Sequence, residues 1–464
     1  MDALLSMVQT INSYLSNYVL IFLLVGMGLV FTARTRFAQV RFFGEGMKRV
    51  FGGFSLRGGK QNSGVSSFQA LATAVAAQVG TGNIVGACGA ILIGGPGAIF
   101  WMWVIAFLGM ATNYAEAVLA QKTRIVDEDG TVHGGPVYYI TSVFKGSGGK
   151  FLAGFFAVAI ILALGFMGSM VQSNSIASTI YTAFGIPTWA MGAVIVLVAG
   201  VIFIGGVQRI ASVTEKLVPI MAIIYLLGGL VLLVMNAGNI LPALALIFEC
   251  AFNPSASIGG VTFGIIAALS QGAKRGLFSN EAGMGSTPHA HALANVKEPH
   301  DQGVVAMIGV FIDTFVVVTM TALVVISVLY VGDGPLTLDA TGLSAGLDKT
   351  NMAQFAFSRF FGAGFGNAFV AICLLFFAFS TILGWNLFAR LNVEYLFGAK
   401  GVKPFFVVSL VFIFLGSVLS NDLVWELADL FNQLMVLPNA IALIALSSVV
   451  AAVAGEHSKK NGAK

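Results

Sequence analysis

A short polar run interrupts a long apolar stretch and carries groups suited to binding a small charged molecule. Residues 78–83 read QVGTGN, with ten apolar-rich residues before them (68–77) and ten after them (84–93). If both flanks are helical, the first helix ends in unpaired carbonyls near 76–79 and the second begins with unpaired amides at 80–82. Amides at a helix N-terminus bind an anion such as a carboxylate, and carbonyls at a C-terminus suit a hard cation. The run therefore predicts adjacent sites for a carboxylate and a cation.

The plain alternative is a glycine-rich packing kink in which Gln78 and Asn83 only bond neighbouring helices. Two side-chain amides, a threonine and two glycines exceed what a kink requires. Backbone groups exposed in the middle of a bilayer would also cost several kcal/mol each unless they line a cavity or bind something. We therefore favour the binding site.

The composition indicates the environment of this run. The chain has 464 residues, of which 57% are hydrophobic and 9% charged, against about 25% charged in soluble chains. This excludes an ordinary soluble protein and predicts an all-α integral membrane protein surrounded by lipid, with no nucleic-acid partner. A helix needs about 20 apolar residues to cross the hydrocarbon core. By that criterion the sequence predicts eleven spans, near 17–33, 68–93, 97–120, 151–183, 188–206, 213–235, 261–290, 303–331, 365–392, 404–420 and 430–454.

The basic residues predict the orientation of these spans. If eleven spans alternate, all but four of the 24 Lys and Arg residues fall on one side. The longest basic connection contains Arg34, Arg36, Arg41, Lys48, Arg49, Arg57 and Lys60. Because cytoplasmic loops are enriched in Lys and Arg, we expect the N-terminus outside, the C-terminus in the cytoplasm, and the protein in the cell inner (plasma) membrane.

A second interrupted segment lies five spans after the first. Residues 261–270 read VTFGIIAALS, and the polar run QGAKRGLFSNEAGMGSTPHAHA follows at 271–292. Two interrupted segments in corresponding positions indicate a transporter site between structural repeats. Because five is odd, the two sets of five spans enter the membrane from opposite sides. We expect inverted repeats over 68–235 and 236–455, after an extra helix and basic loop at 1–67 and before a cytoplasmic tail at 456–464.

Several runs resemble the alanine or glycine:cation symporter family. They are GGPGAIFWMWVIAFLGMATNYAEA (94–117), QVGTGNIVG (78–86), KRGLFSNEAGMGS (274–286) and FFAFSTILGW (376–385). The resemblance implies a LeuT-type five-plus-five inverted repeat, in agreement with the span arithmetic. It also implies import of small neutral amino acids, chiefly alanine and glycine, coupled to Na⁺ or sometimes H⁺.

The resemblance also implies site residues. The substrate carboxylate would lie on the amides of Gly80, Thr81 and Gly82, and Asn83 would face a second cation beside it. The better-shared sodium site would take five oxygens, from Ala76, Val79, Phe377, Ser380 and Thr381. No other cofactor is implied.

Further residues are expected around the substrate. Gln78 is large where the leucine-type pattern is small, and we expect it to restrict the pocket to small substrates. Gln172 and Asn174 lie on a span that flanks the pocket in such folds, with interhelical hydrogen bonding as the alternative. Phe278 is a candidate lid and Trp385 a candidate wall, and each is equally explained as packing.

Asp313 is the most conspicuous acid within an apolar span, and intramembrane acids are usually functional. It could neutralise a cation, receive the substrate ammonium or carry a coupling proton. The alternative is a buried pair with Lys274 or Arg275. The role of Glu281 stays open.

These observations predict a secondary active symporter and not an enzyme. The sequence has no repeated filter loops or rings of pore-lining acids, as a channel would have, and no P-loop for ATP-driven transport. It also has no histidine-rich metal cluster and no nucleophile–base pair. Na⁺ or H⁺ as the coupling ion, and alanine, glycine, D-alanine, serine or glutamine as the substrate, stay open.

Overall fold

The computed structural model describes residues 2–52, 64–253, 256–258, 261–337 and 346–462. Arg57 and Lys60 of the basic connection lie outside the described residues. The first half of the described chain contains α1 (Asp2–Tyr14), η1 (Leu15–Leu20), α2 (Ile21–Arg34), α3 (Ala38–Arg41), α4 (Phe43–Gly52), α5 (Ser67–Gln78), η2 (Gly82–Gly86), α6 (Ala87–Gly94), α7 (Gly97–Thr123), β1 (Ile125–Val126), β2 (Val132–His133), α8 (Pro136–Val143), α9 (Gly146–Ile160), η3 (Ile161–Gly168), α10 (Ser169–Phe184), α11 (Thr188–Ile204) and α12 (Gly206–Met235).

The second half contains η4 (Ala237–Asn239), α13 (Ile240–Phe252), β3 (Ala256–Ile258), β4 (Val261–Phe263), α14 (Ile265–Asn280), α15 (Pro288–Leu293), α16 (Pro299–Val310), η5 (Phe311–Val318), α17 (Thr319–Leu329), η6 (Pro335–Thr337), α18 (Met352–Phe361), α19 (Ala363–Phe397), η7 (Ala399–Gly401), α20 (Val402–Val418), α21 (Asn421–Ala445) and α22 (Ser447–Gly462). The two hairpins β1–β2 and β3–β4 are antiparallel.

The all-helical membrane architecture is confirmed, and the chain is a multi-pass membrane protein. Among the described residues, eight helices are long and apolar enough to span a bilayer, and a ninth span results if α5 and the following helix, bent by 47°, count together. The predicted total of eleven is not confirmed. Predicted spans five and seven correspond to α11, of 17 residues, and α14, of 16 residues, and both fall below the length of an ordinary span.

The second interruption lies later in the chain than expected. Residues 261–263 form strand β4, and α14 continues through Lys274 and Arg275. The helix ends at Asn280, because Glu281 has a left-handed φ of 58°, and Gly283 and Gly285 follow with φ of 90° and 81°. Left-handed residues commonly terminate helices, so the break occupies 281–287 and not the basic run before it.

Predicted span eleven, 430–454, is also displaced. Helix α21 begins at Asn421, nine residues earlier, and ends at Ala445, after which α22 forms a separate helix. The division into two inverted repeats stays a prediction.

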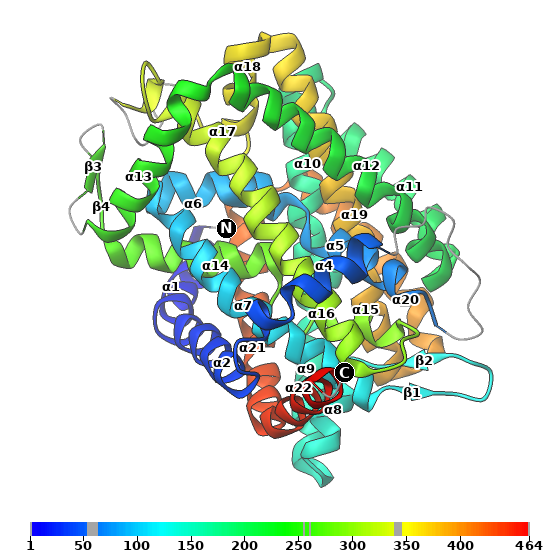
Figure 1. Cartoon of the computed structure of the whole chain (residues 1–464). Helices are drawn as coiled ribbons and strands as arrows, with labels where there is room; N and C mark the ends of the chain where they lie inside the picture. The colour runs from blue at the N-terminus through cyan, green and yellow to red at the C-terminus, as the bar shows by residue number, and fades with distance from the viewer. Residues whose placement is uncertain (1, 53–63, 254–255, 259–260, 338–345, 463–464) are drawn as a thin grey trace.

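Figure 1 shows the arrangement of these elements. Helix α18 and the β3–β4 pair lie toward one end of the bundle, whereas α8, α22 and the β1–β2 hairpin lie toward the other. Helix α5 packs against α12 and α19, and α14 packs against α6 and α7. Both interrupted helices are thus held inside the bundle by long continuous helices.

Candidate substrate and cation site

The first interruption is a true break between two helices. Helix α5 begins with a capping box at Ser66 and Gln69, which satisfies amides at its start. It ends at Gln78, because Val79 adopts an extended backbone with φ −80° and ψ 91°. The chain becomes helical again at Gly82, and the axes of the two parts differ by 47°.

The amides that follow the break are directed at side-chain oxygens. The Gly80 amide donates to Asn83 Oδ1 at 2.8 Å, and the Thr81 amide donates to Gln172 Oε1 at 3.1 Å. An ideal Cβ at Gly80 would overlap the Thr381 hydroxyl, so only glycine allows this approach. Both Thr81 Oγ1 and Gln172 Nε2 are buried without a hydrogen-bond partner among the described residues. The Thr81 hydroxyl and the Gln172 side-chain NH₂ therefore provide hydrogen-bonding capacity for a carboxylate beside the backbone amides of the break.

All five oxygens expected for the sodium site meet on one side of the break. Thr381 Oγ1 lies 2.9 Å from the Ala76 carbonyl oxygen, 3.5 Å from that of Val79 and 3.1 Å from that of Phe377. Ser380 Oγ lies 3.3 Å from the Ala76 carbonyl oxygen and 2.8 Å from that of Phe377. The cluster is buried and contains only neutral oxygen ligands, which suits a hard monovalent cation.

Asp313 lies on the other side of the break, among hydroxyl and amide donors. Its carboxylate accepts from Asn83 Nδ2 at 2.5 Å and from Ser279 Oγ at 3.0 and 3.1 Å. Thr314 Oγ1 donates to it at 2.8 Å. The carboxylate is fully buried, and no cationic side chain pairs with it among the described residues.

The alternative pairing of Asp313 with Lys274 or Arg275 is wrong. Lys274 Nζ lies 2.8 Å from Asp429 Oδ2, and Arg275 Nη2 lies 3.1 Å from the same oxygen. Asp313 is therefore a buried acid without a cationic partner in the described structure, and three polar donors hold it beside the break.

Aromatic side chains close another side of the break. A Cβ at Gly82 would lie 3.2 Å from the Phe278 ring. That ring packs edge-on against Trp385 at 5.6 Å between centroids and lies 4.9 Å from Trp425. Trp385 Nε1 donates to Glu281 Oε1 at 2.5 Å. Phe278 and Trp385 are thus brought to the break, and Glu281 anchors Trp385.

Gln78 and Asn174 have different surroundings from those expected. Gln78 Nε2 donates to the Asn280 carbonyl at 2.6 Å and so joins the two breaks. Asn174 Nδ2 donates to the carbonyls of Gly416 and Leu419 on α20 and at its end. The structure does not bring Asn174 to the break; it lies on the α20 side of α10 and forms interhelical hydrogen bonds there.

Two residues near Phe278, Trp425 and Asp429, were not identified from the sequence. Trp425 contacts Phe278, and the Arg275 guanidinium lies 4.6 Å from its ring centroid. Asp429, one turn later, holds Lys274 and Arg275. The signal was present, since Asp422, Glu426 and Asp429 follow helical spacing, but the predicted span began at 430 and excluded them.

Glu116 holds the second break in place. Its carboxylate accepts from the amides of Gly283 at 3.0 Å and Gly285 at 2.9 Å, and from Asn439 Nδ2 at 2.7 Å. The amides of the second break that lack helical partners are therefore satisfied by the carboxylate of Glu116. Those of the first break face neutral side chains.

The chain is similar to known transport proteins over its whole length. The model of the sodium:alanine symporter family matches residues 1–464. The chain is 41% identical over 464 residues to the sodium/alanine symporter AgcS of Methanococcus maripaludis, covering 99% of both chains. It is 36% identical over 458 residues to the amino-acid carrier protein AlsT of Bacillus subtilis, covering 98% of this chain and 92% of that one.

A solved structure supports the fold alone. The Na⁺-coupled sialic acid symporter in its substrate-bound outward-open state aligns with a TM-score of 0.51 and 11% identity. The alignment covers 87% of this chain and 82% of that one. A likeness at this identity indicates a shared arrangement of helices, and residue roles must come from the geometry above.

Proposed function

The chain belongs to the sodium:alanine symporter family, and on that premise we propose how it works. It is a secondary active symporter that moves a small neutral amino acid, alanine foremost, together with Na⁺. The substrate carboxylate binds at the amides of Gly80, Thr81 and Gly82. The Na⁺ ion binds among the oxygens of Ala76, Val79, Phe377, Ser380 and Thr381.

The observation that supports this coupling is the position of Thr381. Its hydroxyl lies 2.9 Å from the Ala76 carbonyl oxygen and also against the Gly80 backbone. A cation held by these oxygens would fix the end of α5 relative to α19. The same contact would fix the amides that receive the carboxylate, so Na⁺ binding prepares the substrate site.

The side chains around the break favour a small substrate. Phe278 lies against Gly82, and Trp385 and Trp425 pack around Phe278. Gln172 lies close to both Gly80 and Thr81. Alanine and glycine fit this description, and D-alanine, serine and glutamine are the competitors to test.

Asn83 and Asp313 form a second site for a cation or a proton. Asp313 is buried and has hydrogen-bond donors but no cationic partner in the described chain. A bound Na⁺ would compensate this charge, and so would protonation. The choice between them separates Na⁺-coupled transport from its H⁺-coupled alternative.

We place the N-terminus outside and the C-terminus in the cytoplasm of the inner membrane, from the distribution of basic residues. In this orientation α5 is the cytoplasmic half of the first interrupted span. The pair of Arg275 with Asp429, beside Trp425, then covers the site on the outer side. Substrate enters when this pair separates and leaves when α5 moves.

Uptake of labelled alanine into proteoliposomes tests the proposal. We expect accumulation with an inward Na⁺ gradient, none with an equal K⁺ gradient, and competition by unlabelled glycine. Accumulation driven equally by a pH gradient without Na⁺ would favour the H⁺-coupled alternative. Uptake that ignores both gradients would overturn symport.

A further inference from the structure

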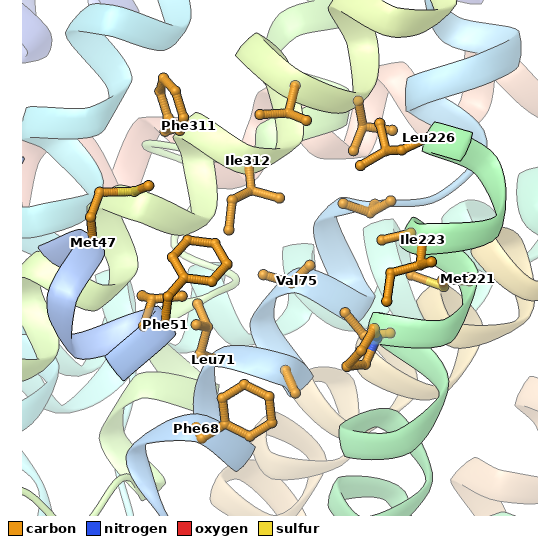
Figure 2. A pocket seen from close by; sticks show the side chains of 18 residues that line it. Met47, Phe51, Phe68, Leu71, Val75, Met221, Ile223, Leu226, Phe311 and Ile312 are labelled. Atoms are coloured by element: carbon orange, nitrogen blue, oxygen red, sulfur yellow. The ribbon is translucent and has the colours of Figure 1, made fainter. Parts of the chain in front are cut away.

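A wholly apolar cavity lies beside the proposed cation site. It measures about 330 Å³ and is enclosed by α4, α5, α12 and η5. Figure 2 shows Phe51 of α4, Leu71 and Val75 of α5, and Met221 of α12 directed toward one space. Every residue that lines it is apolar. Its volume is within the range of about 300–1,000 Å³ typical of small-molecule sites.

The cavity opens sideways, toward the hydrocarbon of the bilayer. Ile223, at its edge, is 56% exposed, and the same face of α12 continues with the exposed residues Leu227 and Leu230. A cavity without polar partners does not hold ordered water. Its natural occupant in a membrane is a hydrocarbon chain.

The cytoplasmic rim of the cavity favours a negatively charged headgroup. Helix α4 directs Met47, Val50 and Phe51 into the cavity, and exposed Lys48 lies between them in sequence. Lys216 is exposed and lies one helical turn before Pro219 and two turns before Ile223, on the same side of α12 as these two lining residues. Neither lysine forms an ion pair in the described part of the chain.

The acidic and basic neighbours of these lysines are already engaged. Arg49 pairs with Glu45 at 3.0 Å and with Asp301 at 2.7 Å. Glu215 is buried and accepts from Gln69 Nε2 at 3.0 Å. Lys48 and Lys216 are thus cationic side chains without an ion pair among the described residues, and basic residues at the cytoplasmic surface favour anionic lipids.

The inner wall of the cavity touches the cation site. Val79, whose carbonyl belongs to the five-oxygen cluster, lines the cavity. Met221 also lines it, and its sulfur accepts from Ser380 Oγ at 3.5 Å. A chain in the cavity would therefore pack against the half-helix α5 and against the side chains behind the proposed sodium ligands.

We propose that this cavity binds one acyl chain of an anionic phospholipid, whose phosphate lies at Lys48 and Lys216. A bound chain supports α5 in the position that assembles the five-oxygen cluster. The effect on transport and the cytoplasmic position of the headgroup rest on the proposed function. The binding of an acyl chain in the cavity does not.

Photo-crosslinking tests the binding on the full chain. The probe is phosphatidylglycerol carrying a diazirine in one acyl chain, added to protein in phosphatidylcholine vesicles. We expect crosslinks at cavity residues of α5 and α12, reduced at least fivefold by Ala222→Phe, which fills the cavity, and unchanged by Val234→Phe on the exposed face of α12. Ile223→Trp, at the mouth, is a second blocking variant that disturbs no buried packing. Labelling spread evenly over α12 and insensitive to both blocking variants would overturn the site.

A second experiment tests the preference of the site for an anionic headgroup. The double change Lys48→Gln with Lys216→Gln should abolish the preference for the phosphatidylglycerol probe over a phosphatidylcholine probe, whereas Lys400→Gln should preserve it. A preference that survives the double change would overturn the anionic assignment.

The effect of the bound chain on transport is tested with the blocking variant. If Ala222→Phe removes crosslinking while Na⁺ activation of alanine uptake stays as in the wild type, the proposed effect on transport fails and the binding site stands. Crosslinking in a protein that transports no alanine would count against the proposed function alone.

Discussion

The Thr381 hydroxyl lies 2.9 Å from the carbonyl oxygen of Ala76, at the point where α5 ends. This contact joins a continuous helix, α19, to an interrupted one. Because an unpaired helix-end carbonyl inside a membrane is costly, the contact also helps to stabilise the break by satisfying the Ala76 carbonyl. The same hydroxyl can become a cation ligand, since its lone pairs face the cluster when its hydrogen turns away.

Gly80→Ala should weaken alanine binding, because the added Cβ would overlap the Thr381 hydroxyl and approach Gln172 Oε1 to 3.2 Å. We expect at least a tenfold weaker affinity, which corresponds to about 1.4 kcal/mol. Gly26→Ala is the matched control, since a Cβ at Gly26 meets nothing within 4 Å. Equal alanine affinities in the two variants, measured by calorimetry, would show that the amides near Gly80 do not receive the substrate.

Asp313→Asn should weaken the coupling of ion movement to alanine transport, because it removes the charge of the side chain and keeps its shape. The neutral side chain cannot compensate a second cation or carry a proton beside Asn83 and Ser279. We expect the charge moved per alanine to fall and the transport rate to drop at least tenfold, measured as current and tracer uptake in the same proteoliposomes. Asp333→Asn, an exposed acid at the rim of the molecule, is the control. An unchanged charge-to-alanine ratio in Asp313→Asn would remove Asp313 from the coupling site.

Asp429→Asn should strongly destabilise the protein. It leaves Lys274 and Arg275 partly or fully buried and without their shared carboxylate, and breaking a buried ion pair costs about 3–5 kcal/mol. Asp422→Asn on the same helix removes a 73% exposed partner of Lys349, and exposed pairs contribute about 0–1 kcal/mol. Thermal unfolding in detergent should separate the two variants clearly. Similar Tm values would contradict the buried-pair assignment.

Contact between the tail helix α22 and the start of α16 should depend on pH. The hydrogen bond from Lys460, at 2.7 Å, lowers the pKa of Glu298, and the same bond raises the pKa of Lys460. The Glu298 contribution is present above its ordinary pKa of 4.5 and is lost as pH falls through the lowered value. The Lys460 contribution is present below 10.5 and is lost as pH rises through the raised value.

The Glu298–Lys460 pair therefore stabilises the contact between α22 and α16 fully between pH 4.5 and pH 10.5, the ordinary pKa values of the two groups. Glu298→Gln should lower Tm slightly at pH 7, and its difference from the wild type should vanish near pH 3. A difference that is the same at both values would show that the pair does not stabilise the tail.

The sequence predicted the first break well and the second one poorly, for a physical reason. At 78–83 the glycines and amides interrupt an apolar run, so local chemistry and structure agree. At 271–280 the charges of Lys274 and Arg275 suggested a loop, but a helix tolerates them because Asp429 pairs with both. That pairing joins residues about 150 positions apart and is invisible to local patterns.

The sequence also predicted the surroundings of individual side chains only in part. The five oxygens of the cation cluster followed from family resemblance, and the structure brings them together. Asn174 and Gln172 were both expected near the substrate because their span flanks the pocket in LeuT-type folds. Two positions along a helix change the direction by about 200°, so Asn174 bonds α20 instead. Which face of α10 meets the break is decided by helix packing.

The most direct test of the central claim is the Na⁺ dependence of alanine binding in Thr381→Ala, with Thr319→Ala as a control that lies outside the cluster. The account predicts that the Na⁺ concentration for half-maximal alanine binding rises at least tenfold in Thr381→Ala and stays within twofold in the control. An unchanged Na⁺ curve in a folded Thr381→Ala protein would contradict the account, because the hydroxyl that joins the cation cluster to the break would then have no part in coupling.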